Sequence, residues 1–385
     1  MLDDGACFEG FACGAGREAE GEVVFTTGMT GYQETLSDPS FYGQIVAFTS
    51  AHTGNYGATP LDDEGPGPHM PGSRVPGPRA SGAVFHDLFT EPAGEAGSGF
   101  FPHWRATESL DRRLAREGVT GITGVDTRAL TLHLREHGAR GGVISALDLD
   151  RPSLLRRARA LPPMRGRDLA RLAGCDRAYA YDAGDAVRAS APPSVGGREF
   201  TVAVMDFGCK RSILTHLCRS GMKVTVWPAA TSAEDILGFH PDGVLLSNGP
   251  GDPEPCGYAV KAIRKLLGKV PIFGICLGHQ LLGLALGAKT YKLPFGHHGM
   301  NHPVIDLVTH RVCVTSQNHG FCVDPHTLPV ACEATHWNLN DNTLEGLAVK
   351  DAPAFSVQFH PEAAPGPADA ANLFGRFRDL MAESC

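Results

Sequence analysis

The sequence has no long hydrophobic run. No stretch approaches the roughly 18 uninterrupted apolar residues of a membrane-spanning helix. The first ten residues, MLDDGACFEG, also lack the basic and apolar regions of a secretion signal. We therefore expect a cytoplasmic protein that has no membrane partner.

Positive charge is also scarce. The 34 Lys and Arg residues are outnumbered by 42 Asp and Glu residues, which gives a formal net charge of −8. Proteins that bind nucleic acid carry a basic surface. An arginine-rich tract from Arg105 to Arg171 is interleaved with acidic residues, a pattern typical of solvated helix faces. The composition therefore argues against a nucleic-acid partner.

Paired cysteines are missing as well. The 11 cysteines contain no CxxC pair, and an odd, scattered set fits reduced thiols better than a disulfide or zinc framework. We expect one to be a nucleophile and most others to be packing residues, including Cys209, Cys218, Cys313, Cys322 and Cys332. Three histidines lie close together in the sequence without a nearby cysteine or acidic set: His297, His298 and His302. Structural hydrogen bonding is therefore favoured for them, and no metal ligand is predicted.

The length, in contrast, is enough for two domains. At about 150 residues per domain, 385 residues predict two domains and a linker. The stretch 180–198, AYDAGDAVRASAPPSVGGR, is rich in small residues and has no apolar period, so we assign domains to 1–179 and 199–385 on either side of it. A second Pro/Gly tract, 65–80, is predicted to be a long surface loop.

The second half alternates strand-like and helix-like segments. Strands are expected at 200–205, 223–227, 243–247 and 270–275, and helices at 210–219 and 258–267. This alternation indicates βαβ units in a mainly parallel sheet flanked by helices, where ligands bind at the carboxyl ends of strands. In the first half, the expected strands at 21–26 and 45–49 and helices at 107–117 and 127–136 leave both α/β and α+β open.

Cys276 stands between Gly274 and Gly278, directly after an apolar strand and before an apolar helix. The pattern G-x-nucleophile-x-G is that of a nucleophile elbow, a sharp turn that exposes the nucleophile at the edge of a sheet. At a helix N-terminus, the unpaired N–H groups and the dipole favour a thiolate and can bind an oxyanion. Leu277 would supply one such N–H. A buried packing thiol is the alternative.

His360-Pro361-Glu362 follows the strand expected at 354–359. Pro361 favours an extended preceding residue, and residues i and i+2 of an extended segment point to one side, so we expect Glu362 beside the His360 ring. A carboxylate that orients a histidine, which in turn deprotonates a thiol, is a catalytic arrangement. A polar residue at a strand end is the alternative.

The loop 247–253, SNGPGDP, follows another expected strand. Small residues let backbone amides approach a ligand closely, so Gly249 is a candidate second oxyanion donor and Gly251 a candidate substrate contact. Alone, the loop would indicate only a turn. Together, the elbow, the histidine–carboxylate pair and the loop favour a catalytic centre.

These motifs resemble a known family. SNGPGDP, FGICLGHQ, QNHGF and FHPEA are similar to the motifs of class I, triad-type glutamine amidotransferases. GEVVFTTGMTGYQETLSDPS, GNYG, VDTRALT, FGHHGMNHPV and HPEAAPGP resemble the small subunit of carbamoyl-phosphate synthetase over nearly the whole chain. The resemblance implies a C-terminal amidotransferase domain, with a mainly parallel sheet flanked by helices, preceded by a smaller α/β N-terminal domain.

The resemblance also implies an activity and its residues. It makes Cys276 the nucleophile, His360 the base and Glu362 its orienter in releasing ammonia from L-glutamine through a glutamyl thioester. It assigns glutamine binding, at an interdomain cleft, to Ser40, Gly249, Gly251, Leu277, Gln280, Asn318, Gly320 and Phe321. This half-reaction needs no cofactor in this chain, and the sequence has no P-loop GxxxxGK[ST].

A partner follows from the same resemblance. ATP and its metal ion are expected on a large subunit that makes carbamoyl phosphate from ammonia, bicarbonate and two ATP, in a heterodimer or a higher assembly. Two alternatives stay open: an amidotransferase subunit of another synthetase, such as that for anthranilate or GMP, and a non-catalytic regulatory subunit.

Two places depart from the family pattern. Ser50-Ala51-His52-Thr53 stands where Tyr-Pro is usual before Gly54-Asn55. Most of the first strand expected ahead of MLDDG is missing, which implies either a misassigned start or a first sheet without one edge. Neither pathway, arginine or pyrimidine, is favoured by the residues.

Overall fold

The structure is a computed structural model. It describes residues 1–66, 70, 72, 79–90, 103–185, 187 and 198–384. Most of the predicted loop 65–80 and of the predicted linker 180–198 lies outside these residues. The chain divides into two compact units. The first comprises 1–64, 79–164 and 294–299, and the second comprises 65–78, 165–293 and 300–385. Residues 165–179, which the sequence assigned to the first domain, thus group with the second unit.

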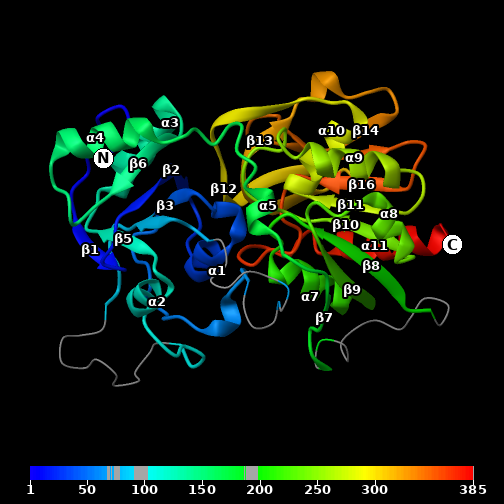
Figure 1. Cartoon of the computed structure of the whole chain (residues 1–385), viewed down its shortest axis with the longest axis horizontal. Coiled ribbons are helices and arrows are strands. Elements are labelled where there is room, and N and C mark those ends of the chain that lie inside the picture. The colour runs from blue at the N-terminus through cyan, green and yellow to red at the C-terminus, as the bar shows by residue number, and fades with distance from the viewer. Residues whose placement is uncertain are drawn as a thin grey trace. The chain divides into compact units, whose positions relative to one another are not determined.

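The first unit is built on a six-stranded sheet of order β1-β5-β4-β3-β2-β6 (Figure 1). Its four central strands are parallel, and the two edge strands, β1 and β6, run antiparallel to their neighbours. The strands are β1 (Phe11–Gly14), β2 (Ala19–Thr26), β3 (Gln44–Phe48), β4 (Gly82–Val84), β5 (Thr120–Thr123) and β6 (Arg140–Ile144). The first unit is therefore of the α/β class.

The helices of the first unit begin where side chains cap them. Ser109, Asp126 and Asp150 each accept a hydrogen bond from a backbone N–H in the first turn of the helix that follows. The Ser109 cap explains why the helix expected from residue 107 begins at Leu110. The helices are α1 (Tyr32–Ser37), α2 (Leu110–Glu117), α3 (Thr127–His137) and α4 (Arg151–Ala160), with 3-10 turns η1 (Pro39–Phe41) and η2 (Pro60–Asp62).

The second unit contains a ten-stranded sheet of order β13-β12-β14-β15-β16-β11-β10-β8-β9-β7. Five neighbouring strands are mutually parallel: β16, β11, β10, β8 and β9. Strands β15, β14 and β7 run antiparallel to their neighbours. The strands are β7 (Tyr179–Tyr181), β8 (Phe200–Asp206), β9 (Met222–Pro228), β10 (Gly243–Leu246), β11 (Ile272–Ile275), β12 (Thr290–Asp306), β13 (Val312–Val323), β14 (Cys332–Asn338), β15 (Leu344–Val349) and β16 (Ala354–Val357).

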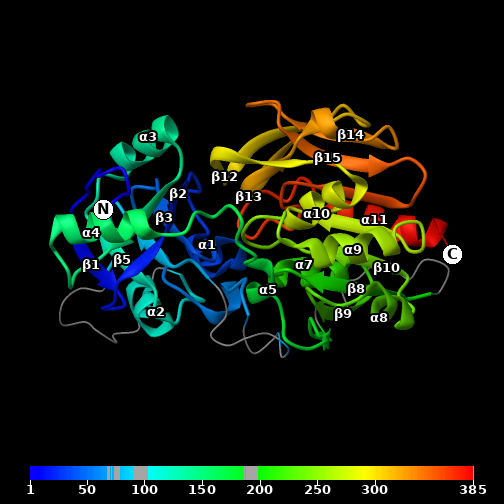
Figure 2. The same cartoon turned by 45° about the horizontal axis from the view of Figure 1, so that its top comes forward.

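Helices cover both faces of the parallel strands, as Figure 2 shows. Alternate residues of β8 point to opposite faces, so Val202 and Val204 pack with α7 and α11, while Ala203 and Met205 pack with α8, α9 and α10. This confirms the predicted fold class. The helices are α5 (Ala170–Ala173), α7 (Arg211–Arg219), α8 (Ala233–Gly238), α9 (Gly257–Leu266), α10 (Leu277–Leu286) and α11 (Asn372–Glu383), with the turn η3 (Pro325–Thr327).

Two predictions made from the sequence need correction. The predicted linker begins with strand β7, because Tyr179 and Tyr181 alternate inward and pair with β9. The arginine-rich tract is not wholly a solvated face, because Arg113 is buried and pairs with Glu108 at 3.3 Å.

Several side chains of the second unit pack in its core. The rings of Phe374 and Phe377 on α11 are fully buried there. Of the cysteines expected to be packing residues, Cys313 is half-buried and the other four are buried, and every described cysteine is a free thiol. No helix in the described part of the chain is both long and apolar enough to cross a membrane.

Candidate active site

The turn between β11 and α10 carries Cys276 in a strained backbone conformation. Its φ of 53° and ψ of −104° lie outside the regions that residues with a Cβ ordinarily occupy. The two flanking glycines make this turn possible: a Cβ on Gly274 would lie 2.8 Å from the Gly278 carbonyl oxygen, and one on Gly278 would lie 2.2 Å from the Leu246 carbonyl oxygen. The structure therefore has the geometry of a nucleophile elbow.

The Cys276 thiol is buried where several chain segments meet. Its backbone N–H donates to the Val357 carbonyl of the neighbouring strand, with an N···O distance of 2.9 Å. Its Sγ lies 3.5 Å from the Asn318 carbonyl oxygen. Leu277, the first residue of α10, presents an N–H at a position where a helix offers no acceptor of its own. The sulfur thus stands beside the positive end of a helix dipole.

His360 and Glu362 form a buried pair next to this thiol. His360 Nδ1 lies 2.6 Å from Glu362 Oε1, and the His360 N–H donates to the Ser316 carbonyl of β13. The local backbone differs from the expected one: β16 ends at Val357, and residues 360–363 form a turn closed by the Ala363 N–H on the His360 carbonyl. The turn, rather than an extended strand, brings the carboxylate back to the ring.

Lys210 completes the arrangement and was missed by the sequence reasoning. Its Nζ lies 2.9 Å from Glu362 Oε1 and 2.6 Å from the Ala363 carbonyl oxygen, and only 2% of the residue is exposed. Its backbone N–H donates to the Asn248 side chain. The available signal was a cation in the loop that follows strand β8, at the carboxyl edge of the sheet.

The charges of these groups are mutually dependent. Burial alone would lower the pKa of the His360 imidazole, but the Glu362 carboxylate and then the Cys276 sulfur outweigh burial and raise this pKa to about 10. Burial would likewise raise the pKa of the Glu362 carboxyl group, but Lys210 and His360 hold it below its usual range. The site therefore favours a protonated imidazole beside the sulfur and an ionised carboxylate behind it.

The loop after β10 is held by close backbone packing. A Cβ on Gly249 would lie 2.2 Å from the Phe207 carbonyl oxygen and 2.9 Å from the Leu277 side chain. Gly251 has a φ of 91°, which favours glycine, and a Cβ there would lie 2.9 Å from the Arg167 carbonyl oxygen. The loop thus packs Gly249 against the residue that follows Cys276.

The remaining predicted binding residues of the second unit lie around the elbow. Gln280, one turn into α10, donates to the Phe321 carbonyl at 2.7 Å and to the Gln358 side chain at 3.1 Å. Asn318, Gly320 and Phe321 all lie on β13, and the Lys292 ammonium stands 5.2 Å from the centre of the Phe321 ring. Gln280 is therefore fixed to the strand that also contacts the thiol.

Ser40 lies in the first unit, in the turn η1. It is buried, and its backbone N–H donates to the Asp38 side chain at 2.8 Å. The departure at 50–53 is accommodated in the same unit, where the Thr53 N–H donates to the Asp87 carbonyl and its own carbonyl accepts from Phe89.

Two of the three histidines for which structural hydrogen bonding is predicted make contacts within their own units. The His298 ring lies 5.7 Å from the Phe41 ring in the first unit. In the second unit, the His302 carbonyl accepts a hydrogen bond from Thr315.

Comparisons with known proteins match both parts of the chain. Residues 203–380 match the family model of class I glutamine amidotransferases, and residues 1–144 match that of the carbamoyl-phosphate synthase small chain, CPSase domain.

Similar proteins cover nearly the full length. A carbamoyl phosphate synthase small chain from Syntrophotalea carbinolica is 49% identical over 99% of this chain and 96% of the relative. The protein of the same description from Escherichia coli K12 is 47% identical over 99% of this chain and 96% of its own length. A crystal structure described as a glutamine amidotransferase from Thermotoga maritima aligns with a TM-score of 0.35, at 18% identity, over 49% of this chain and 86% of its own.

Proposed function

The chain belongs to the carbamoyl phosphate synthase small-chain family, and from that membership we propose that it is the subunit that hydrolyses glutamine. Its second unit carries the class I glutamine amidotransferase domain. The observation that carries the proposal is the buried His360–Glu362 pair, joined at 2.6 Å beside a cysteine held on a strand-to-helix elbow.

The chemistry follows from these groups. The Cys276 thiolate attacks the carboxamide carbon of L-glutamine, and the negative oxygen that forms is stabilised by the N–H groups of Leu277 and Gly249. His360 donates its proton to the departing nitrogen, which leaves as ammonia. The neutral imidazole then takes a proton from water, which attacks the glutamyl thioester and releases glutamate and the thiolate.

Substrate binding is assigned to residues around the elbow. In the proposal, glutamine is held by Gly249, Gly251, Leu277, Gln280, Asn318, Gly320 and Phe321, with Ser40 as a contact from the first unit. The packing of Gly249 supports this assignment, because it holds the loop backbone against Leu277, the residue that follows Cys276.

The proposal includes a partner. The relatives are described as small chains, and the sequence has no P-loop, so we assign ATP, its metal ion and the synthesis of carbamoyl phosphate to a large subunit. That subunit would receive the ammonia released here, in a heterodimer or a higher assembly. No cofactor is assigned to this chain.

The test uses the chain co-purified with its large subunit. Cys276→Ala is expected to abolish carbamoyl phosphate synthesis from glutamine while leaving synthesis from free ammonia intact. Cys218→Ala, which removes another buried thiol on α7, is the matched control and should support both. Loss of both activities in Cys276→Ala would contradict the division of labour.

The same preparation separates the alternatives. Glutamine-dependent formation of anthranilate or GMP with a different copurifying synthetase would identify another amidotransferase subunit. No glutamate release by any wild-type complex would indicate a non-catalytic subunit.

A further inference from the structure

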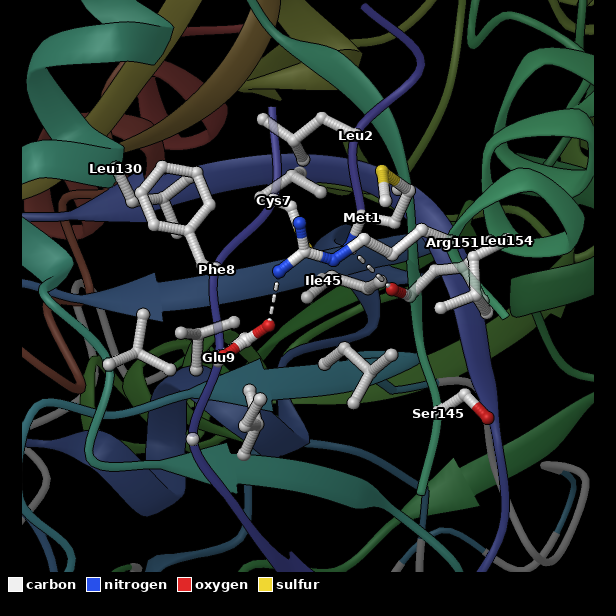
Figure 3. A pocket seen from close by; sticks show the side chains of 18 of the residues that line it. Met1, Leu2, Cys7, Phe8, Glu9, Ile45, Leu130, Ser145, Arg151 and Leu154 are labelled. Atoms are coloured by element: carbon white, nitrogen blue, oxygen red, sulfur yellow. Dashed lines mark hydrogen bonds and ion pairs between the residues drawn. The ribbon is translucent and has the colours of Figure 1, made fainter. Parts of the chain in front are cut away.

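The first unit contains a cavity that the glutaminase chemistry does not use. It has a volume of about 340 Å³ and lies between one face of the six-stranded sheet, the segment 7–10 and helix α4 (Figure 3). Every residue that lines it belongs to the first unit. This volume falls in the lower part of the range of about 300–1,000 Å³ that small-molecule sites occupy.

The floor of the cavity is a continuous apolar surface. Four neighbouring strands each contribute one branched aliphatic side chain to it: Val23 of β2, Ile45 of β3, Val84 of β4 and Ile122 of β5. The strands are parallel, and Val23 pairs with Ile45 while Val84 pairs with Ile122. Ile45 stands opposite Gly82 and Val84 opposite Ala47, so the two pairs lie on the same face of the sheet but two residues apart along the strands. Leu130 of α3 and Leu154 of α4 add apolar walls.

The polar groups at the mouth are already paired with one another. Glu9 and Arg151 meet across the hollow, as Figure 3 shows, with a distance of 2.5 Å between Oε1 and the guanidinium nitrogen. Their side chains are 77% and 64% exposed, so the pair lies in water. The Ser145 hydroxyl donates to Glu18 and accepts from two backbone N–H groups.

No lining residue presents a buried polar side-chain atom without a hydrogen-bond partner. A charged or strongly polar ligand would therefore lose its hydration without gaining a side-chain partner inside. Water is a poor occupant for the same reason, because a buried water needs two to four polar partners. The Met1 amino group at the wall donates to the Val143 carbonyl at 3.1 Å, and the Cys7 thiol is a weak hydrogen-bonding group. The lining therefore favours a ligand that binds mainly through dispersion and the hydrophobic effect.

We propose that this cavity is a binding site for a neutral, mainly aliphatic small molecule. Its hydrocarbon part covers the apolar floor formed by Val23, Ile45, Val84 and Ile122, and any hydroxyl group stays at the mouth beside Glu9 and Arg151. The site is independent of Cys276 and of glutamine hydrolysis.

A tryptophan reporter tests the proposal in the full-length chain. Leu149 lines the cavity and is 75% exposed, whereas Leu147, two residues earlier, is 72% exposed and does not line it. With 1-octanol as the probe, Leu149→Trp is expected to show a saturable blue shift of its emission. Leu147→Trp is the matched control and should show no saturable change.

Filling the cavity should remove the response. Val84→Phe in the Leu149→Trp background is expected to weaken octanol binding about tenfold or more. Ile122→Phe is the second filling variant, in case the first does not fold by circular dichroism. The melting temperature of the unsubstituted chain should rise with octanol, since a ligand that binds only the folded state stabilises it. That rise should be absent in the filled variants.

Charged analogues decide the ligand class. Octanoate and octylammonium are expected to bind about tenfold more weakly than 1-octanol. Tighter binding of octanoate would overturn the proposal in favour of a carboxylate site on Arg151. Equal responses of the two tryptophan variants, or an unchanged response after filling, would overturn the site itself.

Discussion

At the scale of single residues, the proposed active site is a chain of three charges that passes from Lys210 through Glu362 to His360. Each member is buried, so each charge depends on its neighbour for compensation. Single substitutions at the three positions should therefore have different effects on activity and stability.

Glu362→Gln should shift the pH profile of glutamine hydrolysis. The carboxylate raises the pKa of His360, so its removal lowers that pKa, and imidazolium is lost at a lower pH. We expect the limb of the kcat/KM profile that reports His360 to move about one to two pH units towards acid, and kcat to fall about a hundredfold or more.

The control for this experiment is Glu333→Gln, an exposed carboxylate on β14. Its profile should match the unsubstituted chain. An unshifted profile in Glu362→Gln would show that Glu362 does not set the protonation of the histidine.

Lys210→Met should destabilise the fold as well as the activity. It removes one of the two cationic partners of the buried Glu362 carboxylate, Lys210 and His360, which costs about 3–5 kcal/mol in the free energy of unfolding. The double variant Lys210→Met/Glu362→Gln should recover much of that stability in urea unfolding but not the activity. Lys223→Met removes an exposed ion pair with Glu199 and should change stability by less than about 1 kcal/mol.

The individual residues were not equally predictable. Cys276 and its glycines could be identified because the elbow is a local pattern of five residues. Lys210 could not, because its role depends on Glu362, which lies 152 positions away, and one sequence does not show which distant groups share a buried pocket.

At the scale of elements, the turn between β11 and α10 depends on close packing against β10. Gly278→Ala would place a Cβ 2.2 Å from the Leu246 carbonyl oxygen, and this backbone atom has no freedom to move away. We expect a loss of about 1–3 kcal/mol in unfolding free energy and a loss of glutaminase activity.

Gly257→Ala is the matched control for that element. Gly257 begins α9, and a Cβ there meets nothing within 4 Å. Because alanine favours helix, this variant should be as stable as the parent chain or up to about 1 kcal/mol more stable. A Gly278→Ala variant that is equally stable and active would show that the elbow tolerates a side chain.

The elements themselves were largely predictable because their apolar periods are strong. Strands β8 to β11 were expected within two residues of their observed bounds. Strand β7 was missed because it lies in a small-residue stretch and exists only through its pairing with β9. The turn at 360–363 differs from the extended segment predicted there, because the Ala363 N–H closes a turn on the His360 carbonyl, a contact that the effect of Pro361 on its neighbour does not reveal.

At the scale of the whole molecule, stability should fall in mild acid. Burial lowers the pKa of His279 to about 3 and that of His336 to about 4. Below an unfolded pKa of about 6.5, the unfolded chain binds protons that the folded chain does not, so stability is lost as the pH falls from about 6.5 towards 4. Each group contributes about 1.4 kcal/mol per pH unit in that window.

Urea unfolding between pH 7 and pH 4 measures this slope. His279→Asn keeps a side chain able to hydrogen-bond Ser356. It should lower by one the number of protons taken up on unfolding, and so reduce the slope of unfolding free energy against pH. A slope that is unchanged in the variant would show that His279 is not the group responsible.

The division into units was the least predictable feature at this scale. Composition marks stretches that avoid regular structure, but it does not show which distant segments pack together. Residues 165–179 and 294–299 group with units that their neighbours in sequence would not suggest.

The division into two units limits how they can be separated by cleaving the polypeptide. The backbone passes from one unit to the other after residues 64, 78, 164, 293 and 299. No single cut therefore releases either unit as an uninterrupted piece, and the stretch 294–299 would leave the first unit in any bisection of the chain at 164. Neither unit is one continuous segment of the sequence, so an experiment that seeks the second unit as an autonomous fragment must reconnect the chain rather than only shorten it.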